Sequence, residues 1–434
     1  MAHHGRPSES SNPGHEPTHC LRANCIEQES VERSECPPDF IHGHKPPASL
    51  NPGKFALPNL PCRSYQSDKT PRRRQEHLQT ITNSGSTMLR SLVTRLSSTT
   101  KVDPSATTPR PDGFLTAKQS SALFAPTNPE DDGEECLHDC ETCTISYPRK
   151  FEIDEDDKLY GEIQGWSRHL IVATGKTDWV RDVADEKDSV MEAVAKHTEA
   201  VQGGKLMLSA SNIPVPEIVD EKEQHIGPYG KERPTTVLLM PAFTFVDNVR
   251  PIHVPELITS VINTATTNTT RLAPQITPTQ SLDALPANLS TRPCPHRAVI
   301  LLCSQATRDA RCGQSAPLLR RELERHLRPL GLYRDLHDER PGGVGIYFIS
   351  HVGGHKYSAN MMVYRRGDEP DQGSEGSVET GKAPGEAMQC IWLARIRPED
   401  CENVVRYTVL QGKVVKPERQ LRGGFDRGRG IVSW

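Results

Sequence analysis

Hydrophobic positions in the last third of the chain form short runs typical of strands, with one helical pattern between them. The continuous run RAVILLC, residues 297–303, predicts a strand buried on both faces. Leu319, Leu323 and Leu327 then recur at i, i+4 and i+8, so an amphipathic helix is predicted over 317–327, with Ser315 as its N-cap. Three more strands and a closing helix are predicted downstream, over 345–350, 360–364, 390–396 and 398–410.

Residues 297–434 are therefore predicted to form one compact α/β domain. Its order of elements is typical of a thioredoxin-like layout, in which four strands have helices packed on the faces. The stretch 368–386 interrupts the pattern and is predicted to be an acidic loop rich in Gly, Pro and Ser.

The middle of the chain, residues 121–258, mixes strand and helix patterns and is predicted to form an α/β or α+β domain. A strand is predicted over 168–174 and a helix over 185–201. The strong apolar run 235–246 contains Pro241, which predicts that this strand is split or lies at a sheet edge.

Composition separates these two predicted domains from the rest of the chain. Hydrophobic residues make up 35% of the chain, against roughly 45–50% in ordinary globular proteins, and proline accounts for 36 of 434 residues. Residues 1–120 are rich in Pro, Ser, Thr and His without a helical or strand period, so they are predicted to be disordered. Residues 259–296 are predicted to be a linker for the same reason.

The charge balance and the lengths of the apolar runs exclude two classes of protein. Lys and Arg number 52 and Asp and Glu 56, so the net charge of −4 argues against a strongly basic nucleic-acid binder. No run approaches the roughly 18 apolar residues of a membrane span. No signal peptide is recognised at the start, so the twelve cysteines favour metal or redox chemistry over a disulfide framework.

One segment of the N-terminal region has the composition of a mitochondrial presequence. Residues 88–101 are rich in Arg and Ser, contain no acidic residue and place four aliphatic side chains on one helical face. Because a presequence belongs at an N-terminus, we hypothesise that Met88 is the natural start, with import into the matrix or intermembrane space. The alternative is a surface helix in a disordered tail.

The strongest chemical signal is a set of two cysteines and two histidines. Cys303 and Cys312 are separated by eight residues, and His351 and His355 by three, and each pair begins where a predicted strand ends. Such ends gather at one edge of an open α/β sheet. Two thiolates with two imidazoles suit zinc or an iron–sulfur cluster. Gly353 and Gly354 allow a tight turn between the histidines.

This pattern, Cys-x8-Cys followed by His-x-Gly-Gly-His, resembles the sucrase/ferredoxin-like family of fungi and plants, and within it the branch linked to altered inheritance of mitochondria. The resemblance implies a thioredoxin-like ferredoxin domain whose [2Fe–2S] cluster has Cys303 and Cys312 on one iron and His351 and His355 on the other. It also implies an electron carrier with an unknown redox protein as partner, rather than a classical enzyme. A Cys2His2 zinc site in a binding module is the alternative, although zinc fingers usually space their cysteines more closely.

Cluster ligation by imidazole has two consequences. Neutral histidines leave the cluster less negative than four thiolates would, so reduction is expected to be easier. The outer imidazole nitrogens can also exchange a proton, so reduction is expected to be coupled to proton uptake. Arg308, Arg311 and Lys356 could present positive charge to a partner, or could simply be solvated.

The first interpretation of a second cysteine group is an accessory role in redox chemistry or metal binding. This group consists of Cys136, Cys140 and Cys143. Cys140 and Cys143 could exchange a disulfide, which would make the protein a thiol redox protein or sensor; alternatively the group could bind a metal with His138. The acidic run 131–135 is expected to raise the thiol pKa values and disfavour a reactive thiolate.

The last residue, Trp434, ends a Gly- and Arg-rich segment that is not expected to contribute to a core. Related cytosolic family members end in a Trp that resembles a recognition tail for the cytosolic cluster-assembly machinery. Trp434 is therefore expected to contact that machinery, which makes a cytosolic location the alternative to a mitochondrial one.

Overall fold

The computed structural model describes residues 104–216, 233–272, 289–367 and 385–434, all of which belong to one compact unit. A sheet of 13 strands runs through it, so the predicted mixed α/β class is confirmed. Met88 and the predicted presequence lie outside the described residues. Among the described residues, no helix has both the length and the apolar character needed to cross a membrane.

The first half of the sheet is built on a strand–helix–strand unit with two further strands. Strand β3 pairs in parallel with β4 and antiparallel with β5, and β5 pairs with β6, which gives the order β4-β3-β5-β6. The predicted split of the strand around Pro241 is confirmed, because a turn there separates β5 from β6. The bounds are β3 Arg168–Ala173, α3 Val190–Lys196, β4 Leu206–Ser211, β5 Thr235–Met240 and β6 Thr244–Val249.

The second half repeats this arrangement. Strand β8 pairs in parallel with β9 and antiparallel with β10, and β10 pairs with β11, so the order is β9-β8-β10-β11. A helical segment follows the fourth strand in both halves. The bounds are β8 Ala298–Cys303, α5 Ala310–Leu327, β9 Val344–Ile349, β10 Met361–Arg365, β11 Gln389–Leu393, α6 Cys401–Asn403 and the π-helix η10 Val404–Val409.

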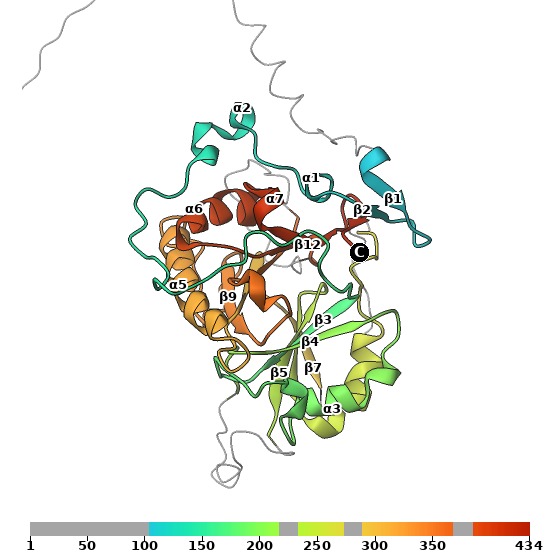
Figure 1. Cartoon of the computed structure of the whole chain (residues 1–434). Helices are drawn as coiled ribbons and strands as arrows, with labels where there is room; N and C mark the ends of the chain where they lie inside the picture. Colours follow the sequence, from blue (N-terminus) through green and yellow to red (C-terminus); the bar gives the residue numbers. More distant parts are fainter. Residues whose placement is uncertain (1–103, 217–232, 273–288, 368–384) are drawn as a thin grey trace, which may run out of the picture. The chain divides into compact units, whose positions relative to one another are not determined.

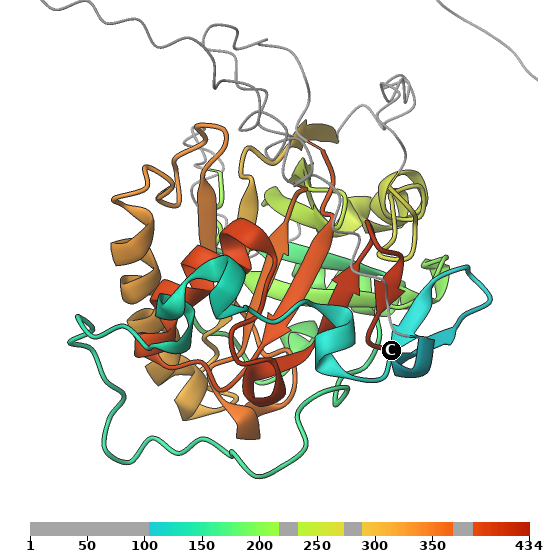
Figure 2. The same cartoon turned by 90° about the horizontal axis from the view of Figure 1, so that it is seen from above.

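The two halves join through their parallel-paired edge strands, β4 and β9, where Ser211 pairs with Ile349 (Figures 1 and 2). The sheet therefore continues from one predicted domain into the other. Part of the predicted linker 259–296 is also ordered, because it contains the end of the π-helix η6 Leu257–Ile262 and the edge strand β7 Ser290–Pro293. The part of this stretch from 273 to 288 lies outside the described residues.

Side chains on the two faces of the sheet form separate hydrophobic clusters. Along β8, Ile300 and Leu302 point into one cluster and Val299 and Leu301 into the other, as the two-residue period of a strand requires. Helices α3 and α5 both cover the first cluster. The second cluster takes no residue from any described helix and is rich in aromatic rings. Helices were predicted on the faces of the sheet, and the described helices pack on one of them.

The helix-free faces of the two halves pack against each other. His169 in β3 is fully buried, and its Nδ1 lies 3.1 Å from the Tyr364 hydroxyl in β10, although three strands separate β3 from β10 in the sheet order. The Trp166 and Trp392 rings meet edge to face at 5.6 Å between centroids. The strands of the two halves run in different directions in Figure 2. The twisted sheet thus closes on itself around one shared core.

The N-terminal boundary of the ordered region lies earlier than predicted. Residues 104–120, predicted to be disordered, form a 3-10 turn and the strand pair β1–β2 (Figure 1). Strand β2 pairs with β13, and β13 with β12, so these residues are held by the sheet rather than by their own composition. The bounds are β1 Thr107–Pro109, β2 Leu115–Ala117, β12 Leu421–Asp426 and β13 Ile431–Val432.

The remaining described helical segments are short. They lie at turns and along the strand edges: η1 Pro104–Ala106, α1 Ser120–Leu123, α2 Pro129–Asp132, η2 Glu134–Leu137, η3 Val183–Asp185, η4 Thr198–Ala200, η5 Pro251–His253, α4 Val254–Glu256, η8 His355–Tyr357, η9 Pro398–Asp400 and α7 Pro417–Gln420.

Helix α5 begins seven residues before its predicted start. Its N-cap is Asp309, whose carboxylate accepts a hydrogen bond from the Arg311 backbone N–H at 2.9 Å, so the prediction of Ser315 as the cap is wrong. Pro317 lies inside the helix instead of opening it. The consequence is that Cys312 lies on the first turn of a regular helix and not in a loop.

Candidate metal centre

The two predicted ligand pairs meet where the parallel strands β8 and β9 end. Cys303 is the last residue of β8, Cys312 lies on the first turn of α5, and His351 follows β9 after one residue. Possible ligand atoms of these three residues all lie within 4.8 Å of one another. Cys303 Sγ is 3.6 Å from His351 Nδ1. Three of the four predicted ligands are therefore brought together, although 38 positions separate Cys312 from the first histidine.

The fourth predicted ligand lies slightly outside this group. The His355 ring is centred 5.4 Å from the His351 ring, and His355 opens the short helix η8. Its side chain is exposed, whereas both cysteines are buried. The site therefore has a buried sulfur side and a solvent-facing imidazole side.

The turn between the histidines depends on both predicted glycines. Gly353 and Gly354 have φ values of 84° and 68°, a left-handed region that other residues rarely occupy. The Arg422 guanidinium donates to the Gly353 carbonyl at 3.1 Å and to the Asn360 side-chain oxygen at 2.7 Å, while the Asn360 amide donates to the Gly354 carbonyl at 3.2 Å. A Cβ on Gly354 would come within 2.5 Å of this guanidinium, so the turn and the cation fit each other closely.

Hydrogen bonding in the site favours a thiolate at Cys303. The pKa of Cys303 is lowered, first by a hydrogen bond from the Cys312 thiol and further by backbone N–H groups of Val352 and Gln305, which together outweigh burial. The pKa of Cys312 is raised by the same bond and by burial. Burial, followed by the charge of His351, lowers the pKa of His355, which favours the neutral imidazole that binds metals.

The basic residues around the site are already engaged. Arg311 forms an ion pair with Asp309 at 2.9 Å, Lys356 pairs with Asp157, and Arg308 donates to a main-chain oxygen at 3.4 Å. Two of the three are thus paired with carboxylates, and a role of these residues in binding a partner stays a prediction.

The irregular segment 154–158 runs across the histidine turn, and the sequence patterns did not predict this contact. The Asp154 N–H donates to the Lys356 carbonyl at 3.1 Å, and the Tyr357 hydroxyl donates to the Lys158 carbonyl at 2.5 Å. The buried Arg395 guanidinium donates to main-chain oxygens of Asp154 and Asp157, both at 2.6 Å. These hydrogen bonds therefore connect the turn that carries His355, through segment 154–158, to the buried Arg395.

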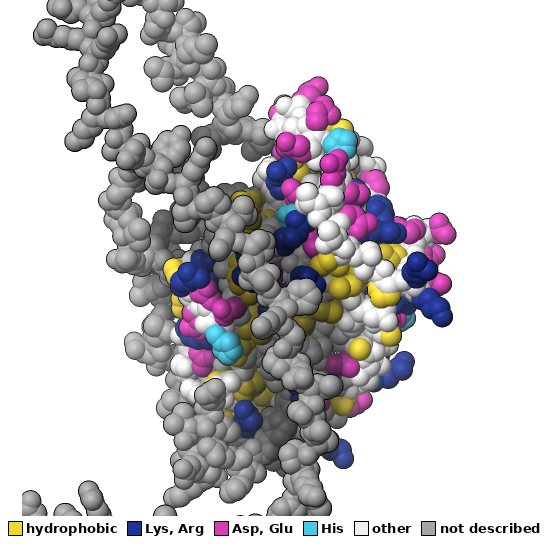
Figure 3. Space-filling model, turned by 90° about the vertical axis from the view of Figure 1, so that its left-hand side faces the viewer, with side chains coloured by type: hydrophobic (Ala, Val, Ile, Leu, Met, Phe, Trp, Pro, Cys, Tyr) yellow, Lys and Arg dark blue, Asp and Glu magenta, His cyan; other side chains and the backbone are white. Residues whose placement is uncertain are grey.

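In the second cysteine group, Cys140 and Cys143 lie on one turn, where the Cys143 N–H donates to the Cys140 carbonyl at 3.3 Å. Cys140 gathers with His326 and Glu402 into a second group of possible ligands, whereas His138 does not belong to it. The pKa of Cys143 is raised by burial and then by the charges of Glu322, Cys140 and Glu399, so residues 131–135 are not the cause predicted for it. Acidic side chains gather at the upper end of the face in Figure 3, where α2 lies. Disulfide exchange between Cys140 and Cys143 stays a prediction.

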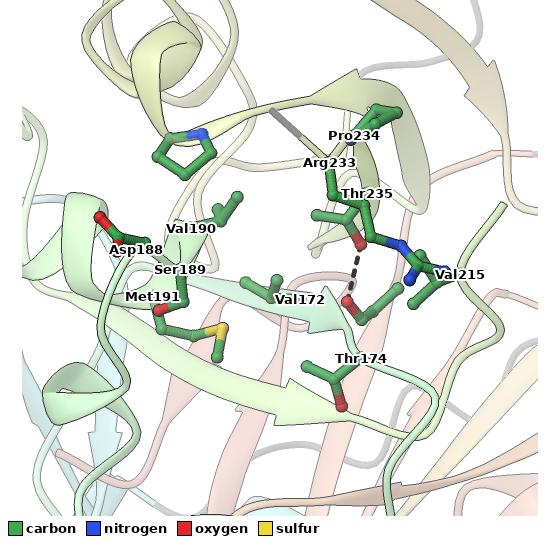
Figure 4. Close-up of a pocket in the computed structure, with 12 residues that line it drawn as sticks. Val172, Thr174, Asp188, Ser189, Val190, Met191, Val215, Arg233, Pro234 and Thr235 are labelled. Carbon is green, nitrogen blue, oxygen red and sulfur yellow. Dashed lines mark hydrogen bonds between the residues drawn. The ribbon is translucent and has the colours of Figure 1, made fainter. Parts of the chain in front are cut away.

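A pocket lies at the end of β3. Strand β3 holds the same place in the first half as β8 holds in the second, so the pocket corresponds in position to the end of β8 that carries Cys303. It is lined by β3, the start of α3 and the start of β5, with Arg233 and Val215 on one side (Figure 4). The Thr235 hydroxyl donates to the Ala173 carbonyl at 2.7 Å in its wall. None of the described residues that line it is a cysteine or histidine, whereas the corresponding end of β8 carries Cys303.

Trp434 is packed into the fold. Its ring lies against Trp166, 4.4 Å between centroids, and its main-chain oxygen accepts hydrogen bonds from Arg110 at 2.5 Å and Thr116 at 3.0 Å. The preceding Val432 is buried in the aromatic cluster. This segment therefore contributes to the core, contrary to expectation, and recognition of Trp434 by an assembly factor would require its release from Trp166.

We expect Gly165→Ala to dislodge Trp434, because the added Cβ would lie 2.3 Å from the indole ring. Overpacking of this kind costs about 1–3 kcal/mol in unfolding free energy, measured by chemical denaturation. The control is the double variant with Trp434→Ala, in which the same substitution should cost almost nothing. An equal cost in both backgrounds would show that Gly165 is needed for another reason.

Comparison with known proteins confirms the family resemblance. The model of sucrase/ferredoxin-like proteins matches residues 159–423. Actin patches distal protein 1 of Saccharomyces cerevisiae is 26% identical over 294 residues, covering 65% of this chain and 82% of that protein. Altered inheritance of mitochondria protein 32 is 30% identical over 121 residues in Clavispora lusitaniae and 31% over 118 in Debaryomyces hansenii, covering 28% and 27% of this chain.

The chain spans about a third of the length of those two mitochondrial-inheritance proteins, 33% in each. No solved structure matches it. The family match extends from before β3 to within β12 and so includes both halves of the sheet and all four predicted ligands. Because that match covers more than half of the chain, the protein belongs to the sucrase/ferredoxin-like family.

Proposed function

We propose that this protein binds a [2Fe–2S] cluster and carries electrons. Cys303 and Cys312 would bind one iron, and His351 and His355 the other. The observation that supports this is the convergence of two thiols and an imidazole at the ends of β8 and β9, with the second imidazole beside them. Thiolate and imidazole are both established ligands of [2Fe–2S] clusters.

The surrounding fold suits such a cluster. A thioredoxin-like unit for the second half is supported by the order β9-β8-β10-β11, in which the parallel pair β9–β8 is extended on its β8 side by two antiparallel strands. We propose that both halves are units of this type and that only the second holds a cluster. The Cys303 pKa, lowered by backbone N–H groups as well as by Cys312, is consistent with a site prepared for thiolate ligation.

The two sides of the site would have different roles. The buried cysteines, with backbone N–H groups directed at Cys303, would hold and tune the cluster. The exposed His355 would be the route by which electrons leave, because it is the ligand nearest to a docking partner. A bound [2Fe–2S] cluster supplies one-electron transfer, and the free nitrogen of His355 would take up a proton when the cluster gains an electron.

We place the protein in mitochondrial redox maintenance, as an electron carrier rather than an enzyme. The family relationship to proteins named for altered inheritance of mitochondria supports this location. A cytosolic location is the alternative, with Trp434 as the feature that an assembly factor would recognise once it is released. The electron donor and acceptor would be redox proteins.

One distance favours a second candidate. Cys303 Sγ and His351 Nδ1 are 3.6 Å apart, close to the separation of two ligands on one tetrahedral zinc ion with bonds of about 2.3 and 2.0 Å. A single zinc ion would make the site structural and redox-inactive.

The visible absorption and EPR spectra of protein purified without oxygen should separate the two candidates. We expect a coloured protein with two iron and two acid-labile sulfide atoms per chain. Its midpoint potential should fall as pH rises, because deprotonation of the histidines removes positive charge from the cluster. A colourless protein containing one zinc per chain would overturn the proposal in favour of the structural site.

A further inference from the structure

A second set of metal-binding side chains meets away from the proposed cluster ligands. Cys140 comes from the irregular segment after η2, His326 from the last turn of α5, and Glu402 from α6. Their possible ligand atoms all lie within 4.8 Å of one another, and Cys140 Sγ is 3.8 Å from His326 Nε2. Three segments that are distant in sequence thus direct a sulfur, a nitrogen and an oxygen to one point.

The guanidinium group of Arg325 already occupies that point. Arg325 Nη2 donates to Cys140 Sγ at 3.3 Å and to His326 Nε2 at 3.0 Å. Because a guanidinium can only donate, the lone pairs of the sulfur and the imidazole nitrogen must both be directed at it. These are the lone pairs that would bind a metal ion, and the guanidinium supplies the positive charge in its place.

The environment permits an exchange of Arg325 for a metal ion. The Arg325 side chain is 40% exposed, so its guanidinium can rotate into solvent. Arg325 Nε also donates to the buried Glu322 carboxylate at 2.8 Å, and this ion pair can persist after the rotation. Burial and the neighbouring Arg325 lower the pKa of His326, which leaves the neutral imidazole that metals bind. Cys140 itself is buried.

We propose that Cys140, His326 and Glu402 form a second metal site, for zinc or a similar borderline divalent cation, which Arg325 closes when no metal is bound. A sulfur, nitrogen and carboxylate set is typical of zinc. Binding would release the thiol proton of Cys140, form bonds to sulfur, nitrogen and oxygen, and displace the guanidinium. The site would cross-link the segment around Cys140 to α5 and α6, and it does not depend on the proposed cluster.

Cobalt(II) is the probe that tests this, because its bond to a thiolate gives a charge-transfer band. The full-length Cys303→Ala/Cys312→Ala variant is used so that cobalt cannot enter the first site through its thiols. We expect one cobalt per chain, displaced by zinc. Cys140→Ala and His326→Ala should lose the band, whereas Cys136→Ala, a buried cysteine four positions away, should keep it.

Two further variants test the role of Arg325 and the carboxylate. Arg325→Ala removes the competing cation, so it should tighten cobalt binding by about tenfold or more, whereas Glu402→Gln should weaken it by a similar factor. Glu402 is partly exposed, so this variant remains informative if Cys140→Ala does not fold. A band that persists in Cys140→Ala, or an affinity unaffected by both Arg325→Ala and Glu402→Gln, would overturn the proposal.

Discussion

Cys303→Ala is expected to abolish the visible spectrum of the purified protein and its iron content. Cys303 is fully buried at the end of β8, next to Cys312 and 3.6 Å from His351, so no nearby described thiol can replace it as a ligand without moving the strand. The matched control is Cys390→Ala, which removes an equally buried cysteine from β11, outside both groups of possible ligands. The control should keep its colour and iron.

Replacing the exposed histidine by cysteine should have a different result. His355→Cys exchanges a neutral imidazole for a thiolate, so the cluster should remain while its spectrum shifts and its midpoint potential falls. The pH dependence of the potential should also weaken, because one of two protonatable ligands has been lost. An unchanged potential and pH profile would show that His355 is not a ligand, and iron retained in Cys303→Ala would contradict the proposed centre as a whole.

Arg422→Gln is expected both to destabilise the fold and to lower the midpoint potential. The Arg422 side chain is 2% exposed, lies 4.5 Å above the Trp392 ring and donates to Gly353, Asn360 and the Glu162 carbonyl. Burial lowers its pKa to about 10, so it stays positive at neutral pH. Its removal leaves buried neutral acceptors unpaired, each of which costs about 1–3 kcal/mol. It also takes away a positive charge that interacts with Cys303.

Two controls separate the loss of charge from the loss of structure. Arg422→Lys keeps the charge but not the forked hydrogen bonds, so the potential should fall less than in Arg422→Gln. Arg365→Gln removes another buried arginine, which pairs with Ala298 at the opposite end of β8 from Cys303. It should lower the denaturation midpoint and leave the potential unchanged. If all three variants shift the potential equally, the effect reports general loosening and not the charge of Arg422.

Local sequence patterns predicted the strands that are buried on both sides. The runs at 298–303 and 168–173 form strands within one residue of their predicted bounds, and the run predicted over 235–246 is divided at Pro241 into β5 and β6. Strand β12 was missed because it contains Gly423, Gly424 and the polar Arg422, which lack the pattern of a strand. The start of α5 was missed because Pro317, which normally marks a first turn, lies inside the helix.

The candidate ligands could be chosen from the sequence because each pair is local. Cys303 with Cys312, and His351 with His355, stand at short spacings beside predicted strand ends. Strands that are parallel and adjacent bring such ends to one edge, so proximity follows from local pattern and topology together. The residues that support them, Arg422 and Asn360, carry no signal in the sequence, because their role depends on contacts between distant strands.

By itself the sequence indicated the α/β class, the strands of both halves except β4, and the four candidate residues of the first site, because strand periodicity and ligand spacing are local properties. Only the tertiary structure decided that both halves share one sheet and core, that Trp434 packs on Trp166, and that Cys140 meets His326 and not His138. These outcomes depend on which faces and edges meet after the sheet twists. A pairing between residues 186 positions apart, as between Cys140 and His326, leaves no pattern in either segment alone.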